Sequence, residues 1–573
     1  MKKLLPIVAL LLAVSAWAQA PKFEWVRPIP AGVSTDGPDA EYYDFRTDPA
    51  GNTYLYGLLY GKTDFGNNVV LLPPQADDEV LFLVKFDPKG KALWGNLIST
   101  ETGETDISRY MDAPGLELDA QGNIYVSGGL GTSVLNFGDG VQLKLLCQFG
   151  CANAFVAKYN PDGKALWAKK IEGGDSFEVQ GAKLATDGDF IYLFGSSSSP
   201  MLDFGDGLAY TNQKPGLFLA KLRTSDGKGI WAKFISSTDF GFFYPTQLTR
   251  SPSGDLWLSG NYGGTIDFGN GLTLPAESSA FFVSNQFIAR YSSDGTPAFA
   301  VNLNASYLDV LDIAWVPDFG GLYVLTNFSD TLRTGKDVLF RSTDQYTSSL
   351  LYLNPNGFSE VLSIAYANDG YAISGVTAGA DGDYYVSGYA NEEDLNVGGI
   401  VVPNVGCFDG MLAKGNLAAE VEWARGVGGT GCEAILGGYY GKSMGLDAKG
   451  DLFLGGGFIE GMNFDNVTSS GSGLVVAKLK TGTVSTAEPA ATDLISVSPN
   501  PSGGSFHLNL PEDWPAGSGW LSMRDLQGRQ VHAQAFSGAG TEVRVALPAG
   551  IYTLTVQCAE RLAQAKVVLQ VGE

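Results

Sequence analysis

One short pattern of alternating apolar and polar residues recurs along most of the chain. The copies are 51–57, 122–128, 189–195, 254–260, 320–326, 382–388 and 450–456, so their last positions lie 62 to 71 residues apart. Each copy carries an aromatic residue at the same place: Tyr54, Tyr125, Tyr192, Trp257, Tyr323, Tyr385 and Phe453. Alternation with a period of two predicts a β-strand, and a regular spacing of this length indicates a repeat architecture.

Each copy lies within a segment that we expect to form four strands. A shorter run and a Gly-Asn or Gly-Asp turn precede the pattern, which predicts a hairpin. A third run follows after an insert, as at 154–160, and a turn then leads to a fourth run, as at 165–171 around Trp167. Repeated groups of four antiparallel strands are typical of β-propeller blades. The sequence therefore predicts an all-β chain in which residues 21–482 form a seven-bladed β-propeller.

The two ends of the array predict how the ring closes. The seventh copy has a third run at 474–480 but no tryptophan-containing fourth run after it. A matching fourth run stands at 23–29, around Trp25. We therefore expect the N-terminal run to complete the seventh blade, which leaves fewer exposed sheet edges.

Composition fits a turn-rich all-β chain and narrows the function. Of the 573 residues, 75 are Gly, 12% are aromatic and 17% are charged, as expected for many strands and turns. The net charge of -24 argues against nucleic acid as a partner, because phosphate binding needs clustered Lys and Arg. The histidines are His507 and His532, so the predicted propeller has no histidine base and no histidine metal ligand.

Residues 1–20 are predicted to be a secretory signal peptide. Lys2 and Lys3 precede an apolar run, and Ala16 and Ala18 offer a cleavage site. The run is too short to cross a bilayer about 30 Å thick, and we expect a soluble mature chain without a membrane anchor. Disulfides persist outside the cytoplasm, so we expect two, with buried free thiols as the alternative; the candidate pairs are Cys147 with Cys151 and Cys407 with Cys432.

The inserts between the second and third runs carry a repeated Asp-Phe-Gly-like motif. Clear copies begin at Asp64, Asn136, Asp203 and Asp267, and weaker ones at Asn396 and Asn463. Protein kinases also contain Asp-Phe-Gly, but in a single copy with a catalytic loop and a strand lysine. We therefore interpret the motif as an extra hairpin in which Phe packs underneath and Gly turns the chain.

An acidic residue precedes the first strand of each predicted blade. If these seven carboxylates surround one channel mouth, they form a weak candidate site for Ca²⁺, since oxygen-rich loops suit that ion. The alternative is that each carboxylate accepts N–H bonds within its own turn. We expect no other cofactor. The candidates are Asp39, Asp106, Asp175, Asp239, Asp309, Asp369 and Glu433.

The last 91 residues differ in composition from the rest of the chain. Residues 483–493 are rich in Thr, Ala and Pro and predict a linker. Short alternating runs punctuated by Gly and Pro then predict a small β-sandwich at 494–573. Four motifs occur there in order, and they contain Pro499, Asn500, Pro501, Gly528, Leu547, Pro548, Gly550, Tyr552 and Lys566.

The repeat and the C-terminal motifs each resemble a known family. The repeat resembles a β-propeller repeat of secreted proteins from the Bacteroidota. Residues 494–573 resemble the type A C-terminal sorting domain of the type IX (Por) secretion system. That resemblance implies that the type IX machinery is a partner, that the protein crosses the outer membrane, and that the domain is then removed, leaving the rest released or attached to the cell surface.

The sequence shows no constellation of catalytic residues that defines a reaction. We therefore expect a non-catalytic propeller, extracellular or attached to the cell surface, that binds a protein or a glycan through its long-loop face. One alternative is a secreted hydrolase or lyase that acts on polysaccharide through carboxylates at the propeller mouth. Another is a structural surface protein stabilised by calcium.

Overall fold

The structure is a computed structural model in which the chain divides into two compact units, Met1–Gly482 and Thr483–Glu573. The described residues form strands and no helix, and so contain no helix able to cross a membrane. They are 20–31, 33–34, 37–38, 40–74, 79–100, 114–130, 133–145, 153–174, 177–211, 214–237, 243–275, 284–317, 319–334, 337–341, 346–354, 357–366, 373–379, 382–391, 394–405, 408–428, 442–458, 461–465, 467–481, 496–500, 502–510, 518–524, 530–537, 541–545, 547–548, 550–558 and 561–570.

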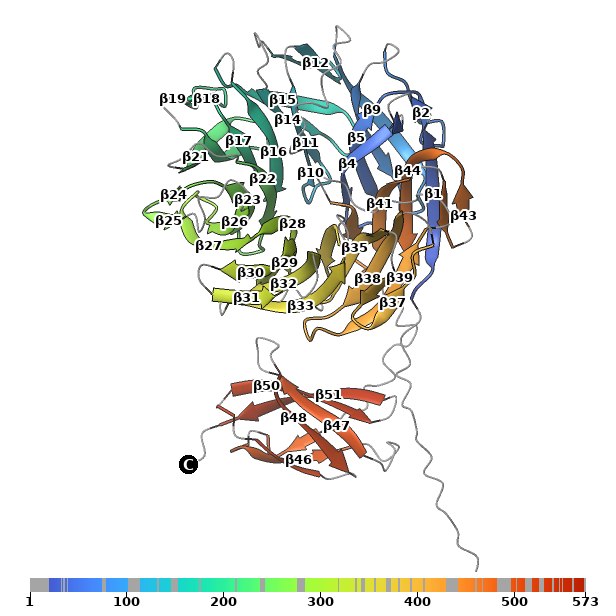
Figure 1. Cartoon of the computed structure of the whole chain (residues 1–573), viewed down its shortest axis with the longest axis vertical. Helices are drawn as coiled ribbons and strands as arrows, with labels where there is room; N and C mark the ends of the chain where they lie inside the picture. Colours follow the sequence, from blue (N-terminus) through green and yellow to red (C-terminus); the bar gives the residue numbers. More distant parts are fainter. Residues whose placement is uncertain are drawn as a thin grey trace, which may run out of the picture. The chain divides into compact units, whose positions relative to one another are not determined.

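The first of these units consists of antiparallel four-stranded groups arranged around a centre, as in a β-propeller (Figure 1). In each group the first strand lies innermost and the fourth lies at the rim. We number the groups in chain order. Group 1 contains β4 (Ala40–Thr47), β5 (Thr53–Leu59), β8 (Val80–Phe86) and β9 (Ala92–Thr100); group 2 contains β10 (Gly115–Leu118), β11 (Ile124–Leu130), β14 (Asn153–Tyr159) and β15 (Ala165–Ile171); group 3 contains β16 (Val179–Thr186), β17 (Phe190–Ser197), β20 (Gly216–Arg223) and β21 (Gly229–Ser237); group 4 contains β22 (Pro245–Arg250), β23 (Leu256–Tyr262), β26 (Ser284–Tyr291) and β27 (Pro297–Ala305). Group 5 contains β28 (Tyr307–Val316), β29 (Gly321–Ser329), β32 (Tyr346–Asn354) and β33 (Gly357–Tyr366); group 6 contains β34 (Gly375–Ala378), β35 (Tyr384–Asn391), β38 (Phe408–Gly415) and β39 (Val421–Val427); group 7 contains β40 (Met444–Leu446), β41 (Leu452–Phe458), β44 (Ser472–Leu479) and β1 (Phe23–Ala31).

The apolar core of this ring lies between neighbouring groups. Its buried side chains fall into seven clusters, and each cluster draws on two adjacent groups. Strand β5, for example, is buried on both faces along its whole length, so its alternate residues contribute to two different clusters. A single four-stranded group therefore buries its apolar side chains only when it has a neighbour on each side.

The repeated Asp-Phe-Gly-like motifs form hairpins, which confirms their structural interpretation. The four clear-copy phenylalanines are buried, and Phe137 packs edge-on against Phe155 with ring centroids 5.4 Å apart. Gly138 turns the chain at a φ of 89°, and its N–H donates to the Asn136 side chain at 3.0 Å. The insert hairpins are β6 (Thr63–Asp64) with β7 (Val70–Leu71), β12 (Ser133–Gly138) with β13 (Val141–Leu145), β18 (Met201–Asp203) with β19 (Ala209–Thr211), β24 (Ile266–Gly269) with β25 (Leu272–Leu274), β30 (Thr331–Thr334) with β31 (Asp337–Arg341), β36 (Leu395–Val397) with β37 (Ile400–Val402), and β42 (Met462–Phe464) with β43 (Val467–Ser469). A short pair, β2 (Val33–Ser34) with β3 (Gly37–Pro38), follows β1.

Several of these hairpins join the sheet of the preceding group. Strand β12 of group 2 pairs with β9 of group 1, where Leu135 lies opposite Thr100. Strands β24 and β30 extend groups 3 and 4 in the same way. The long inserts are thus used in part to hold neighbouring groups together.

The fourth-strand tryptophans form a second repeated link between groups. Trp94 of group 1 donates its indole N–H to the carbonyl of Pro161 in the third-to-fourth-strand turn of group 2, at 3.2 Å. The ring also lies against Gly163 of that turn, where an added methyl carbon would come within 2.8 Å of it. Lys85 of group 1 donates to the same Pro161 carbonyl. Trp167 makes the equivalent contact with group 3, which explains why the tryptophan, lysine and turn glycine recur together.

The N-terminal strand completes group 7, as the ends of the array predict. Strand β1 pairs antiparallel with β44, with Pro28 opposite Val475. Trp25 donates to the Pro88 carbonyl of group 1 at 3.1 Å, so it repeats the contact that Trp94 makes. Lys478 of β44 forms ion pairs with Glu24 and with Asp451, at 3.1 and 2.8 Å.

The C-terminal unit contains two antiparallel sheets that share one buried cluster, which includes Phe506, Met523 and Leu554. Motif residues tie its loops to its strands: the Asn500 side chain accepts the N–H of Val568 at 2.7 Å, and the Tyr552 hydroxyl donates to the Pro548 carbonyl at 2.7 Å. The sheets are β45 (Ser496–Ser498), β46 (Ser505–Asn509) and β49 (Thr541–Arg544), and β48 (Gln530–Ser537), β47 (Ser518–Arg524), β50 (Gly550–Cys558) and β51 (Arg561–Leu569).

We predict that Trp25→Ala destabilises the ring by about 2 kcal/mol, because it removes both ring packing and a hydrogen bond at the closure. Trp25→Phe keeps an aromatic ring and loses the N–H donor, so a smaller loss of about 1 kcal/mol is expected. Chemical denaturation of both variants measures the two values. Wild-type stability in Trp25→Ala would contradict the role given to this contact.

Candidate functional site

The predicted acidic ring falls mostly outside the described residues. Asp309 is described: it lies in β28 opposite Asn327, and its carboxylate accepts a hydrogen bond from the Tyr307 hydroxyl. Among the residues that the structure describes, no group of three or more His, Cys, Asp or Glu is placed to hold a metal ion. The candidates outside the described residues are Asp39, Asp106, Asp175, Asp239, Asp369 and Glu433, together with Cys147, Cys151, Cys407 and Cys432.

Of the sorting-motif residues, Pro501 and Gly528 also lie outside the described residues. Leu547 packs against the core of the C-terminal unit. Gly550 begins strand β50 opposite Leu569, and Lys566 lies in strand β51 opposite Thr553.

A different set of polar residues gathers at the centre of the ring. In each group, one first-strand residue pairs with the next-to-last residue of the repeated pattern on the second strand. We call this the ring position. Its occupants are Asp44, Gly115, Lys183, Gln247, Asp312, Gly375 and Ser443. The tryptophan contacts between groups repeat, whereas the residues at the ring position differ from group to group.

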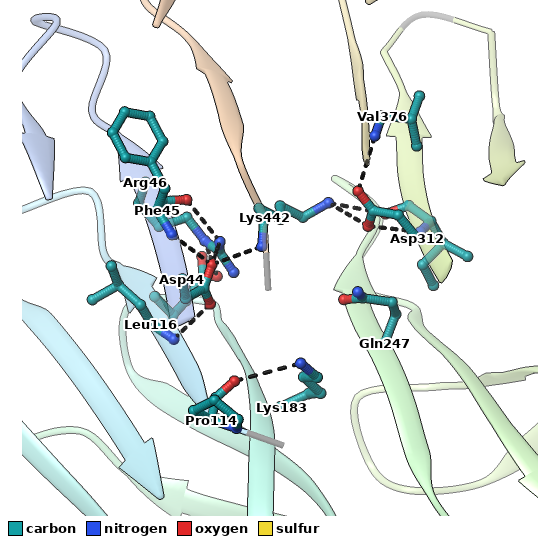
Figure 2. Close-up of polar contacts among 12 residues, drawn as sticks. Asp44, Phe45, Arg46, Pro114, Leu116, Lys183, Gln247, Asp312, Val376 and Lys442 are labelled. Carbon is teal, nitrogen blue, oxygen red and sulfur yellow. Dashed lines mark hydrogen bonds and ion pairs between the residues drawn. The ribbon is translucent and has the colours of Figure 1, made fainter. Parts of the chain in front are cut away.

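Asp44 joins three groups through one carboxylate (Figure 2). Its Oδ1 accepts the backbone N–H of Phe45 at 2.9 Å and of Lys442 at 3.0 Å, and also bonds to the Arg46 guanidinium. Its Oδ2 accepts the N–H of Leu116 in group 2 at 2.9 Å. The side chain is 2% exposed, so these four donors replace the water that the charge loses on burial.

Asp312 repeats this arrangement in group 5. It accepts the N–H of Ile313 at 2.8 Å and the N–H of Val376 in group 6 at 3.1 Å. Its third partner is the ammonium group of Lys442, 3.0 Å from Oδ1. Because the Lys442 backbone N–H binds Asp44, this one residue links the two aspartates, which come from groups 1 and 5 (Figure 2).

In both cases the next group has glycine at the ring position, Gly115 after Asp44 and Gly375 after Asp312. An added methyl carbon at Gly115 would come within 2.7 Å of the Ala182 carbonyl oxygen. The donors to the two aspartates are the N–H groups of the residues that follow these glycines. Each aspartate therefore links its first strand to that of the next group, through the N–H that follows the glycine.

Arg46 and Glu117 extend this charged cluster. Arg46 Nε lies 3.5 Å from Glu117 Oε2. Burial acts to lower the pKa of Arg46, but the carboxylates of Asp44, Glu117 and Asp312 outweigh it and raise that pKa. Burial raises the pKa of Glu117, with repulsion from Asp44 added and attraction to Arg46 opposing.

Lys183 in β16 and Gln247 in β22 are the buried ring-position residues of groups 3 and 4 (Figure 2). The Lys183 ammonium donates to the Pro114 carbonyl at 3.4 Å. Burial lowers the pKa of Lys183 from 10.5 to about 8, and the positive charges of Arg46 and Lys442 add to this while Asp44 and Asp312 oppose it. Gln247 Nε2 donates to the Leu311 carbonyl at 3.0 Å.

This cluster is the part of the site that sequence reasoning missed. The signal was present in the seven aligned units, because a repeated strand position occupied by Asp, Gly, Lys, Gln, Asp, Gly and Ser departs from the repetition around it. Finding it required the register between the first and second strands. That register is irregular, since a bulge precedes the ring position in groups 1, 3, 4 and 5.

No protein-family model matches the chain. A curated relative, an uncharacterized WD repeat-containing protein of Acanthamoeba polyphaga mimivirus, is 29% identical over 126 residues, which cover 22% of this chain and 8% of that protein. The chain therefore matches less than a tenth of that relative's length.

Two solved structures are similar at 12% identity and a TM-score of 0.34. A mutant α-L-arabinofuranosidase of Fusarium graminearum, in complex with an iminosugar inhibitor, covers 64% of this chain and 92% of its own. A protein of unknown function from Dyadobacter fermentans covers 81% of this chain and 99% of its own.

We predict that Lys183→Met stabilises the protein at pH 7 and removes part of its pH dependence. With a folded pKa of about 8 and an unfolded value near 10.5, the folded state releases a proton between these values while the unfolded state keeps it. Wild-type stability should therefore gain up to about 3 kcal/mol from this group as pH rises from 8 to 10.5.

Denaturation at pH 7, 8, 9 and 10 of wild type, Lys183→Met and the exposed-turn control Lys164→Met measures this difference. The gap between wild type and Lys183→Met should narrow as pH rises. A constant gap, or the same change in Lys164→Met, would contradict the lowered pKa.

Proposed function

We propose that the protein is a secreted or cell-surface seven-bladed β-propeller that binds an extracellular protein or glycan without catalysis. Seven four-stranded groups, and the pairing of β1 with β44, support a closed ring of seven blades. The two sheets around one apolar cluster support a β-sandwich at the C-terminus.

The observation that carries the binding role is the variation at the ring position. The tryptophan, lysine and turn-glycine contacts that hold blades together away from the centre repeat from group to group. At the ring position, Lys183 and Gln247 stand where other groups have aspartate, glycine or serine. A few convergent polar groups are typical of a ligand site, and the polar side chains of this cluster lie close together at the centre of the ring (Figure 2).

Export through the type IX system is part of the same proposal. A predicted signal peptide at 1–20 and sorting motifs at 494–573 support it. The machinery would recognise the C-terminal domain, and the propeller would act outside the outer membrane.

A secreted hydrolase or lyase acting on polysaccharide is the second candidate. Glu117 favours it, because a carboxyl group whose pKa is raised by burial beside a second carboxylate is suited to donate a proton. Asp44 is the neighbouring carboxylate, and its oxygens accept four hydrogen bonds.

Glycan and protein arrays, read beside polysaccharide turnover assays, separate the two candidates. We predict that the full chain retains a ligand and that no substrate is turned over. Glu117→Gln should then alter affinity at most. Turnover by wild type that falls at least 100-fold in Glu117→Gln would replace the binding role with the catalytic one.

We predict that deleting residues 494–573 leaves a folded ring that accumulates in the periplasm. The apolar cluster of the C-terminal unit draws only on residues beyond 494, so the ring keeps its seven clusters. Cell fractionation with a protease-protection assay measures the location. Normal appearance of the truncated protein outside the cell would refute the sorting assignment.

A further inference from the structure

The two aspartates of the central cluster have most of their acceptor positions filled within the fold. Asp44 accepts four bonds and Asp312 accepts three, and most of the donors are backbone N–H groups that cannot move away. A carboxylate has about four acceptor positions. Both aspartates are also nearly fully buried, so their charges are largely used within the fold.

Two of the cationic side chains, Arg46 and Lys442, retain donors that no described residue occupies. Arg46 uses Nη1 and Nε within the fold, and no bond from its Nη2 occurs among the described residues. Lys442 donates two of its three ammonium hydrogens, to Asp312 and to the Ile313 carbonyl. The side chains of Arg46 and Lys442 are 18% and 20% exposed, so both are in contact with solvent.

Because the aspartates are satisfied while Arg46 and Lys442 keep donors, we infer that the centre of the ring binds an acidic saccharide, with an oxyanion held by Arg46, Lys183 and Lys442. The oxyanion is the carboxylate of a uronic acid or the sulfate of a sulfated sugar. The inference rests on the proposed binding function and specifies its ligand. Glu117 and the Gln247 side-chain oxygen are the acceptors for sugar hydroxyl groups.

Overall charge favours a saccharide over an acidic peptide. The chain carries a net charge of -24, and its field opposes a ligand with many negative charges. A sugar unit with one oxyanion and several neutral hydroxyl groups experiences less of this repulsion. It also matches a cluster that combines cationic donors with a carboxylate and an amide.

Protonation of the cluster gives the proposal a pH profile. Lys183 faces Asp44, Arg46, Asp312 and Lys442, and its pKa of about 8 means that it loses its charge between pH 7 and 9. An anion beside it favours the charged form, so affinity should fall as pH rises through this range. Burial raises the pKa of Glu117, so acidification removes a negative charge from the same space and should strengthen binding.

The test is calorimetric titration of the full chain with three trisaccharides: a uronic-acid trisaccharide, its neutral counterpart with hydroxymethyl groups, and the sulfated form. We expect one or both charged probes to bind at least 10-fold more tightly than the neutral probe. Raising the pH from 7 to 9 should weaken that binding at least 5-fold. The comparison of the uronic-acid and sulfated probes identifies the oxyanion.

Lys183→Met should weaken charged-probe binding at least 10-fold at pH 7, whereas Lys164→Met, which removes the same charge from an exposed turn, should leave it unchanged. If Lys183→Met fails to fold, the probe series and the pH profile of wild type still decide the question. Equal binding of the neutral probe, no binding of either charged probe, or tighter binding of a glutamate oligopeptide would each overturn the inference. A chain that retains neutral glycans or proteins on arrays but ignores the charged probes would keep the proposed binding function and lose only this ligand.

Discussion

The ring depends on contacts between neighbouring four-stranded groups, because no group has an apolar core of its own. Seven buried clusters lie at the seven junctions, and each second strand contributes side chains to the junctions on both of its sides. Losing one junction therefore exposes the faces of two sheets at once. At four junctions a fourth-strand tryptophan packs against the turn glycine of the next group, and at three junctions an insert hairpin pairs with the preceding group.

Charged and hydrogen-bonded side chains link neighbouring groups at the centre of the ring, whereas tryptophan rings link them nearer the rim. Asp44 and Asp312 each reach across a junction to a backbone N–H of the next group. Lys442 then connects the two aspartates. Lys183 and Gln247 add two further bonds between groups, to the Pro114 and Leu311 carbonyls.

Much of the architecture could be predicted from the sequence because it is repeated. The second-strand pattern, the buried phenylalanine of each clear Asp-Phe-Gly copy, and the pairing of the N-terminal run with the last group follow from comparing copies along the chain. The central cluster could not be found in that way. Lys442 and Asp44 are 398 residues apart in sequence, and the first strands that carry the ring position contain bulges that shift the register. Sequence reasoning placed its candidate acids in the connections before the first strands, whereas the described polar cluster lies largely on the strands themselves.

The closing pair of strands has a mechanical consequence. In the antiparallel pairing of β1 with β44, Phe23 lies opposite Leu479, so the chain enters and leaves the ring at the same end of the pair. Tension between the two chain ends would peel the hydrogen bonds apart one after another. A load carried only by the segment after β44, with the other end free, does not act across that seam. Tethering through the C-terminal side alone therefore leaves this seam unloaded.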